Sequence, residues 1–436
     1  MRPDRPTLAA RRHRAAAALG PLLEPTGAVL LVGAGEPTAV PGGLDRVHPF
    51  DTHPHYFWLT GGVAAGGVIA WDPTGDGWSW FEPPVGEGER VWEGVRGERE
   101  GEPINGLAGW LTARRGRPVV MLGSPLPGVV SDAAIDRDAD ERLLHARRAK
   151  DGWELAAIRR ASEITRAGHR RAQEMIAAGG VTEREIAIEL DHAFRVAGGD
   201  GPGYDTIVGV GPDAAVLHFT PGERSVNAGE TVLVDAGGSL DRYTGDVTRV
   251  YPCGPVSDGA KALIQLVERV QAVAVAGCVV GVEFSELHDQ AVLVLLAGLG
   301  EIGLVRGDPE DLIDRGVGRL FMPHGLGHLV GLGVRDATGT TPGRAHRVSR
   351  SGVCVRLDAA LDTNWVVTVE PGCYFVPALL ELAAADFGDA VDFNAVRALN
   401  KDISGVRIED NVVVHRSDAF NLTREIPKLT DTQHLS

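Results

Sequence analysis

Cysteine is scarce and irregularly spaced in this sequence of 436 residues. The four cysteines, Cys253, Cys278, Cys354 and Cys373, form no CxxC pair. Their spacing suggests neither a disulfide framework nor a thiolate zinc site. Such usage fits a reducing compartment, so we expect a cytoplasmic location.

Long apolar runs and basic blocks are also missing. No stretch of about 18 uncharged apolar residues occurs, which argues against a membrane-spanning segment. The alanine run after Arg14 is short and ends at Gly20-Pro21, so it makes a poor secretory leader. Lys and Arg number 43 against 59 Asp and Glu, a formal net charge of −16. This charge would repel nucleic acid and anionic membranes, and we expect neither as a partner.

What is present is a change of pattern near residue 140. Short apolar runs broken by Gly and Pro predict a small α/β domain over residues 1–140. Its expected strands are 28–32, 56–59, 67–71, 78–81 and 119–122. A segment rich in Ala, Glu and Arg then predicts a long helix, interrupted near Asp151-Gly152.

Residues 145–436 form the second predicted domain, which is dominated by β-type runs. The expected strands are 206–210, 231–235, 247–251, 365–370 and 406–414, with helices around 260–276 and 285–299. A capping box of Thr182 and Glu185 predicts the start of a further helix. The fold class expected for the whole chain is α+β.

Acidic residues interrupt the apolar runs of this second domain. Asp235 ends Thr-Val-Leu-Val-Asp, Glu370 ends Val-Val-Thr-Val-Glu, and Glu409 interrupts Val-Arg-Ile-Glu-Asp-Asn-Val. Asp246 follows a glycine-rich connection that can fold as a hairpin, so it could face Asp235. Each carboxylate alone could cap a turn or lie on a solvated edge strand. Together they favour a shared site, because a buried carboxylate is costly unless paired or metal-bound.

The segment His324-Gly-Leu-Gly-His328 offers nitrogen ligands. A zincin motif would need a helix and a glutamate after the first histidine, and Gly325 stands there instead. Several carboxylates with imidazole form a hard, oxygen-rich set that suits Mn²⁺, Co²⁺ or Fe²⁺ and could accept Zn²⁺. That many anionic ligands predict two metals for charge balance. Two metals that bridge a water and polarise a carbonyl group imply hydrolysis.

The order Asp235, Asp246, His328, Glu370 and Glu409 resembles the pita-bread-fold metallopeptidases. The motifs are Leu-Val-Asp-Ala-Gly, Thr-Gly-Asp-Val-Thr-Arg, His-Gly-Leu-Gly-His, Val-Glu-Pro-Gly and Val-Arg-Ile-Glu-Asp-Asn. That family includes methionine aminopeptidase, aminopeptidase P, prolidase and creatinase. The resemblance covers about residues 145–436, with weaker similarity at 56–61, and looks closest to bacterial Xaa-Pro dipeptidases. It implies a C-terminal pita-bread catalytic domain after a smaller creatinase-like α/β domain.

Carried over motif by motif, the resemblance implies a role for each ligand. Asp235 would bind one metal, His328 and Glu370 the other, and Asp246 and Glu409 would bridge them. Glu370 would also be the base for the bridging water. A further catalytic residue is implied outside the ligand set: His218 would steady the substrate or the tetrahedral intermediate by hydrogen bonding.

The same resemblance assigns the substrate contacts. Tyr204 and Ile207 match positions that line the proline pocket, and Arg407 is counted among the substrate-binding residues. Arg356 falls where prolidases keep an arginine for the dipeptide carboxylate. Arg335 stands where the family normally has a histidine near the scissile carbonyl. A guanidinium there can stabilise an oxyanion but cannot exchange a proton at neutral pH.

The implied function is hydrolysis of the Xaa-Pro bond of dipeptides by a metal-bridged hydroxide, in a homodimer with Mn²⁺ as the expected metal. Arg356 favours this prolidase activity because a cation that closes the pocket would bind the free carboxylate of a dipeptide. The alternatives are an aminopeptidase P that acts on longer Xaa-Pro peptides, an organophosphate or ester hydrolase, and a creatinase-like amidinohydrolase. A relative that has lost catalysis and only binds partners is the alternative from a different class.

Overall fold

The computed structural model describes residues 2–337, 339–346 and 348–429. The chain divides into two compact units, Met1–Arg147 and Arg148–Ser436. Within the described residues, no helix combines the length and the apolar character that crossing a membrane requires.

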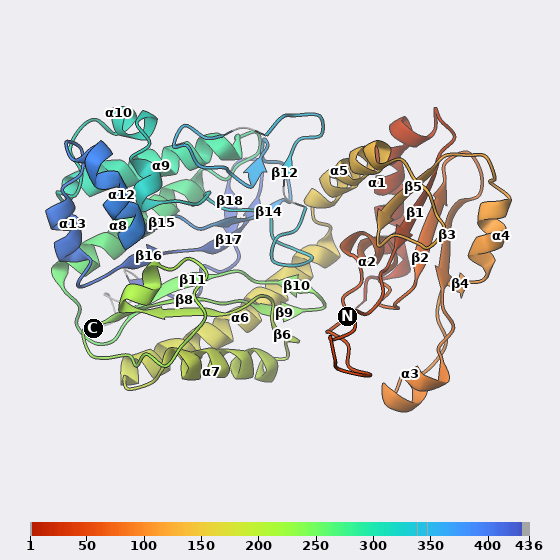
Figure 1. Cartoon of the computed structure of the whole chain (residues 1–436), viewed down its shortest axis with the longest axis horizontal. Helices are drawn as coiled ribbons and strands as arrows, with labels where there is room; N and C mark the ends of the chain where they lie inside the picture. Colours follow the sequence, from red (N-terminus) through yellow and green to blue (C-terminus); the bar gives the residue numbers. More distant parts are fainter. Residues whose placement is uncertain (1, 338, 347, 430–436) are drawn as a thin grey trace. The chain divides into compact units, whose positions relative to one another are not determined.

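The first unit contains a mixed five-stranded sheet with the strand order β4-β3-β2-β1-β5 (Figure 1). Its strands are β1 (Val29–Gly33), β2 (Val68–Asp72), β3 (Gly77–Glu82), β4 (Glu102–Pro103) and β5 (Val119–Gly123). Its helices are α1 (Arg5–Leu23), α2 (Pro54–Thr60), α3 (Glu87–Trp92), α4 (Gly106–Thr112) and α5 (Ala133–Arg148). Every residue of β1 and β2 is buried, as expected for central strands made of apolar residues apart from Asp72 at the end of β2.

The strand expected at residues 56–59 is wrong, because these residues belong to helix α2. Pro54 begins the helix, and Gly61 ends it in the left-handed conformation at φ +66°. Proline at the start and glycine after the end are ordinary helix signals. The aromatic residues Tyr56 and Trp58 suggested a strand, but both are fully buried in this short helix. Tertiary packing therefore outweighs their β-propensity.

The second unit combines several small sheets with long helices (Figure 1). Its three-stranded sheets have the orders β10-β9-β6, β11-β8-β7 and β14-β17-β18, and two further pairs are β12-β13 and β15-β16. The strands are β6 (Gly201–Pro202), β7 (Ile207–Val210), β8 (Thr231–Asp235), β9 (Gly238–Leu240), β10 (Tyr243–Thr244), β11 (Thr248–Pro252), β12 (Gly339–Thr340), β13 (Leu357–Asp358), β14 (Val366–Val369), β15 (Gly372–Tyr374), β16 (Gly405–Arg407), β17 (Asp410–Val414) and β18 (Ala419–Asn421). The expected run at 406–414 is thus two strands, interrupted at Ile408 and Glu409.

The helices of this unit are α6 (Gly152–Ala178), α7 (Glu183–Val196), α8 (Asp258–Ala276), α9 (Phe284–Glu301), α10 (Pro309–Asp314), α11 (Gly318–Phe321), α12 (Pro377–Phe387) and α13 (Phe393–Leu399), with a 3₁₀ turn at Gly211–Ala215. Helices α6, α7, α8 and α9 lie where the sequence predicts helices, whereas α10, α11, α12 and α13 were not predicted. The capping box of Thr182 and Glu185 is present at the start of α7. The predicted interruption of the long helix falls between the end of α5 and the start of α6.

Two strand pairs bring the acidic residues together. β8 and β11 are antiparallel, and Asp235 lies opposite Thr248 in their register. β14 and β17 are also antiparallel, with Val369 opposite Asp410. The two sheets meet where the Glu409 backbone N–H donates to the Thr248 carbonyl at 3.0 Å. Helices α8 and α9 share a hydrophobic core with β14 and β16, and this core supports the junction.

Candidate metal centre

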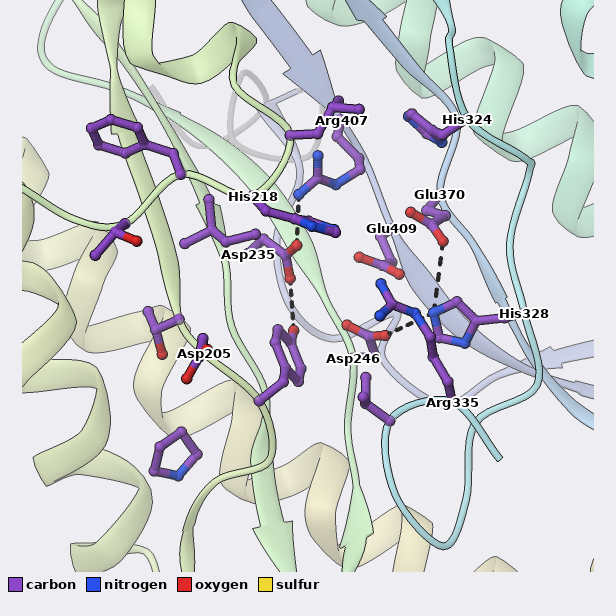
Figure 2. A pocket seen from close by; sticks show the side chains of 18 of the residues that line it. Asp205, His218, Asp235, Asp246, His324, His328, Arg335, Glu370, Arg407 and Glu409 are labelled. Carbon is purple, nitrogen blue, oxygen red and sulfur yellow. Dashed lines mark hydrogen bonds and ion pairs between the residues drawn. The ribbon is translucent and has the colours of Figure 1, made fainter. Parts of the chain in front are cut away.

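All five predicted metal ligands line one cavity of about 1000 Å³ in the second unit (Figure 2). Asp235 ends β8, Asp246 lies shortly before β11, Glu370 directly follows β14, and Glu409 lies between β16 and β17. Strand ends fix the backbone on one side while the adjoining loop leaves the side chain free to face the cavity. The carboxylates that interrupt apolar strands therefore meet at one place.

The tightest group consists of Asp246, His328 and Glu409, all of them buried. One ligand atom of each lies within 4.8 Å of the others. The Nε2 atom of His328 is 3.4 Å from Asp246 Oδ2 and 3.7 Å from Glu370 Oε1. Glu370 therefore adjoins the group, and Figure 2 shows Asp246 and Glu370 directed toward the His328 ring.

The His328 ring is held so that Nε2 faces these carboxylates. Its Nδ1 lies 3.1 Å from the Leu329 carbonyl, which can only accept, so the bonding pattern assigns the proton to Nδ1. Burial lowers the pKa of His328 to about 3, and the ring is neutral at pH 7. An unprotonated nitrogen thus points at two carboxylates. This arrangement is repulsive without a cation and suits a metal ion.

The carboxyl groups are too crowded to remain anionic by themselves. Burial and the negative charges of Asp235 and Glu370 raise the pKa of Asp246 well above its usual range. Burial and neighbouring carboxylates likewise raise the pKa of Glu370 and of Glu409. Like charges in a buried site need either protons or cations. Oxygen-rich donors with one imidazole fit hard divalent ions, so the residues of this site suit a divalent metal ion.

Asp235 is positioned by two neighbours. The Tyr204 hydroxyl donates to its Oδ1 at 2.7 Å, and Arg407 Nη2 donates to its Oδ2 at 2.6 Å. Arg407 also donates from Nε to Thr248 Oγ1 and from Nη1 to the Tyr374 hydroxyl, both at 3.0 Å. Arg407 is 4% exposed, so it links the β15-β16 pair to the sheet of β8 and β11 as a buried cation.

Three supporting residues were not predicted as part of the site. The Thr248 hydroxyl donates to Glu409 Oε2 at 2.7 Å. The Asn411 side chain accepts from the backbone N–H of Asp246 at 2.9 Å and donates to its carbonyl at 2.8 Å. Tyr374 is the third, through its contact with Arg407. The available signal was the alternation of Arg407, Glu409 and Asn411 in a run expected to form one strand.

His324 lies apart from the tight group although it begins the same motif. Its Nδ1 is 2.8 Å from the Gly325 carbonyl, and its Nε2 is 2.9 Å from the Tyr374 hydroxyl. Burial lowers its pKa to about 3. The motif also needs Gly327, since a Cβ atom there would lie 2.1 Å from the Thr368 carbonyl oxygen. That close approach lets the His328 backbone N–H donate to Thr368 Oγ1 at 3.0 Å.

The predicted substrate and catalytic residues line the same cavity. These residues are Tyr204, Ile207, His218, Arg335, Arg356 and Arg407. Figure 2 shows the Arg335 guanidinium directed toward the carboxylates. Burial, followed by the charges of Arg335, Arg407 and Arg356, lowers the pKa of His218. His218 is therefore neutral at pH 7 and can donate or accept a hydrogen bond.

Known proteins identify the family to which this site belongs. Residues 156–416 match metallopeptidase family M24. The chain belongs to metallopeptidase family M24. Among its relatives in this family, a probable Xaa-Pro aminopeptidase of Ajellomyces dermatitidis is 30% identical over 421 residues, which cover 89% of this chain and 87% of that protein. An Xaa-Pro dipeptidase of Xanthomonas axonopodis is 36% identical over 291 residues, 65% of each chain.

The solved structures extend the match with family M24 to nearly the whole chain. An aminopeptidase from Pseudomonas aeruginosa superposes with a TM-score of 0.77 at 25% identity, and the match covers 97% of this chain and 96% of that one. The expected α+β class with a pita-bread domain is confirmed. The roles of the individual ligands stay predictions.

Proposed function

We propose that this M24 metallopeptidase hydrolyses Xaa-Pro bonds, with dipeptides as its substrates and two divalent metal ions at its centre. The observation that carries the proposal is the neutral His328 nitrogen, which faces Asp246 and Glu370 among buried carboxylates. The names of the relatives from Ajellomyces and Xanthomonas support Xaa-Pro specificity.

Asp235, Asp246, His328, Glu370 and Glu409 would hold the two ions, with Asp246 and Glu409 shared between them. The ions would supply a nucleophile at neutral pH and polarise the scissile carbonyl group. Mn²⁺ is the metal we propose, because the donor set is hard and rich in oxygen. A cytoplasmic homodimer completes the proposal and rests on the family resemblance.

The chain's own residues would handle protons and the developing charge. Glu370 would take a proton from the attacking water, because its side chain faces the cavity beside His328 and bound cations would keep it ionised. His218, neutral and on the cavity wall, would donate a hydrogen bond to the oxyanion. Arg335 adds fixed positive charge beside the same position and exchanges no proton.

Dipeptide selectivity is supported by Arg356. Its guanidinium lines the cavity and has no hydrogen-bond or ion-pair partner among the described residues. A dipeptide ends in a free carboxylate next to its proline ring, which a guanidinium can bind in a bidentate manner. Tyr204 and Ile207 would pack against the ring.

A second candidate is cleavage of longer Xaa-Pro peptides. The cavity extends to α7, where Arg184, Ile188 and Asp191 line it, and its volume exceeds what two residues fill. The Ajellomyces aminopeptidase also matches over a greater length than the Xanthomonas dipeptidase does. This candidate uses the same metal centre and the same proton transfers.

A substrate panel tests these proposals. Xaa-Pro dipeptides and Xaa-Pro-Yaa tripeptides would be assayed with Mn²⁺, Co²⁺ or Zn²⁺ added separately to metal-free protein. We expect higher kcat/KM for dipeptides and the greatest activity with Mn²⁺. Preferred cleavage of tripeptides would favour the second candidate. Metal binding without peptide hydrolysis would point to an ester or organophosphate hydrolase, and no metal uptake to a binding relative.

A further inference from the structure

Two arginines in the cavity form no ion pair with any described residue, although the charge of Glu370 acts on Arg356. Arg335 and Arg356 both line the cavity, both are exposed, and neither has a hydrogen-bond or ion-pair partner within the described part of the chain. The other cavity arginines differ, because Arg184 pairs with Glu223 and Arg407 pairs with Asp235. In a chain with a formal charge of −16, acidic partners are abundant. Two unpaired guanidiniums at one cavity therefore need an explanation.

The backbone holds these two arginines on neighbouring segments. The Gly339 backbone N–H donates to the Arg356 carbonyl at 3.0 Å, and β12 pairs in parallel with β13, which directly follows Arg356. Burial, and then the charge of Arg335, lowers the pKa of Arg356, so the two positive charges interact. Like charges at this proximity repel, and a bound anion removes the repulsion.

Buried contacts of the neighbouring residue fix the loop that carries Arg335. The next residue, Asp336, accepts a hydrogen bond from Lys150 Nζ at 2.6 Å and one from the Leu332 backbone N–H at 3.1 Å. The Lys150 and Asp336 side chains are 0% and 2% exposed. This buried ion pair holds the backbone next to Arg335 in place. A residue that binds a ligand needs such a fixed backbone.

The charge balance indicates how many anions the cavity takes. Two divalent ions would balance Asp235, Asp246, Glu370 and Glu409. Arg407 adds a positive charge, but its donors are already taken by Asp235, Thr248 and Tyr374. Arg335 and Arg356 then remain as two positive charges. An ordinary Xaa-Pro dipeptide has one carboxylate, which Arg356 would take under the proposed function. Figure 2 shows the Arg335 guanidinium pointing at the metal ligands.

We propose that Arg335 binds an acidic side chain of the residue before proline, so that the protein prefers dipeptides with two carboxylates, of the Glu-Pro and Asp-Pro type. This inference rests on the proposed function. The side chain of that residue branches from the carbon next to the scissile carbonyl group, which the metal ions would polarise, whereas the free carboxylate lies beyond the proline ring. Arg335 thereby determines specificity at a position where a histidine would not carry a permanent charge.

The decisive comparison uses Glu-Pro and Gln-Pro, which differ in charge but hardly in shape. The wild-type protein should show at least about tenfold higher kcat/KM for Glu-Pro, as expected for a charge-assisted contact. Arg335→Gln should bring the ratio to about one. Arg184→Gln is the matched control, because it removes a cavity arginine that is already paired, and it should keep the ratio. Equal rates on both peptides, or a ratio that survives Arg335→Gln, would overturn the inference.

A second measurement does not depend on hydrolysis. Phenylglyoxal modifies accessible arginines, and peptide mapping of the metal-loaded protein reports the extent at each one. Glutamate should protect Arg335 severalfold better than glutamine does. If no Xaa-Pro peptide is cleaved but this protection is found, the proposed function fails and the anion site stands. If Xaa-Pro peptides are cleaved and protection is equal, the proposed function stands and the anion site is refuted.

Discussion

The Arg407 guanidinium donates to Asp235 Oδ2 at 2.6 Å, and both side chains are buried. This pair links β16 to the end of β8, two strands from different sheets. Arg407 also contacts Thr248 and Tyr374, so one cation fixes three polar groups around the candidate centre. Its role is therefore to position Asp235, in addition to lining the cavity.

Replacing Arg407 by lysine should impair the enzyme while the charge is kept. A single ammonium group cannot reach Asp235, Thr248 and Tyr374 together, because it lacks the planar fork of the guanidinium. We expect kcat/KM on Ala-Pro to fall roughly ten- to a hundredfold, from the loss of charge-assisted hydrogen bonds. Steady-state kinetics with metal content measured in parallel would check this. Near-normal turnover would mean that charge alone suffices.

Asp246→Asn should lose at least one metal ion and nearly all hydrolysis while the fold survives. The amide keeps the shape but removes a negative charge that two cations would share. Metal analysis, circular dichroism and kinetics together test this. Asp205→Asn is the matched control, since Asp205 lines the cavity outside the tight ligand group and should keep both ions. A fully metallated, active Asp246→Asn variant would show that Asp246 is no bridge.

Arg356→Ala should raise the KM for Ala-Pro far more than the KM for Ala-Pro-Ala. Only the dipeptide presents a carboxylate immediately beyond the proline ring, and that contact is worth about 1.5–3 kcal/mol, or roughly ten- to a hundredfold. Parallel kinetics on the two peptides would measure the difference. Equal losses on both would assign Arg356 a purely structural role.

Much of this site could be predicted because the signal for each ligand lies in a short stretch of sequence. Asp235, Glu370 and Glu409 were visible as charges inside apolar runs, and the structure brings them to one cavity with Asp246 and His328. Thr248 and Tyr374 were not found, because threonine and tyrosine are common in strands and carry no signal until their partners are known. The helix at 54–60 was missed because its aromatic residues favour a strand, whereas its proline and glycine favour a helix. Burial in the fold decides between the two, and the sequence does not show that burial.

Removal of one partner from the buried pair of Lys150 and Asp336 should strongly destabilise the folded protein. Asp336→Ala removes one partner of a buried ion pair, which typically costs about 3–5 kcal/mol. Lys150→Met combined with Asp336→Leu should recover part of that loss, because neither charge then remains buried. Urea unfolding of the single and double variants would show it. A loss below about 1 kcal/mol in the single variant would contradict the assignment.

His169 should make the protein sensitive to acid. It is fully buried, with Nδ1 3.0 Å from the Tyr251 hydroxyl and Nε2 3.0 Å from the Ala236 carbonyl, and burial lowers its pKa from 6.5 to about 4. The unfolded chain takes up a proton below pH 6.5 and the folded chain does not until about pH 4. Its contribution is therefore complete above pH 6.5 and is lost progressively as the pH falls toward 4.

The total loss from His169 is roughly 3 kcal/mol. His169→Gln cannot titrate, so its unfolding free energy should fall by about 2 kcal/mol less than that of wild type between pH 7 and pH 5. Urea unfolding at the two pH values measures this difference. Identical pH dependence in the two proteins would show that the pKa of His169 is the same in the folded and the unfolded chain.

The central claim, a dinuclear centre that hydrolyses Xaa-Pro bonds, is tested most directly by titrating metal-free protein with Mn²⁺. Bound metal and the rate of Ala-Pro hydrolysis would be followed at each addition. We predict that two equivalents bind and that most of the activity develops with the second. Full activity after one equivalent, or no metal uptake at saturating Mn²⁺, would contradict the account.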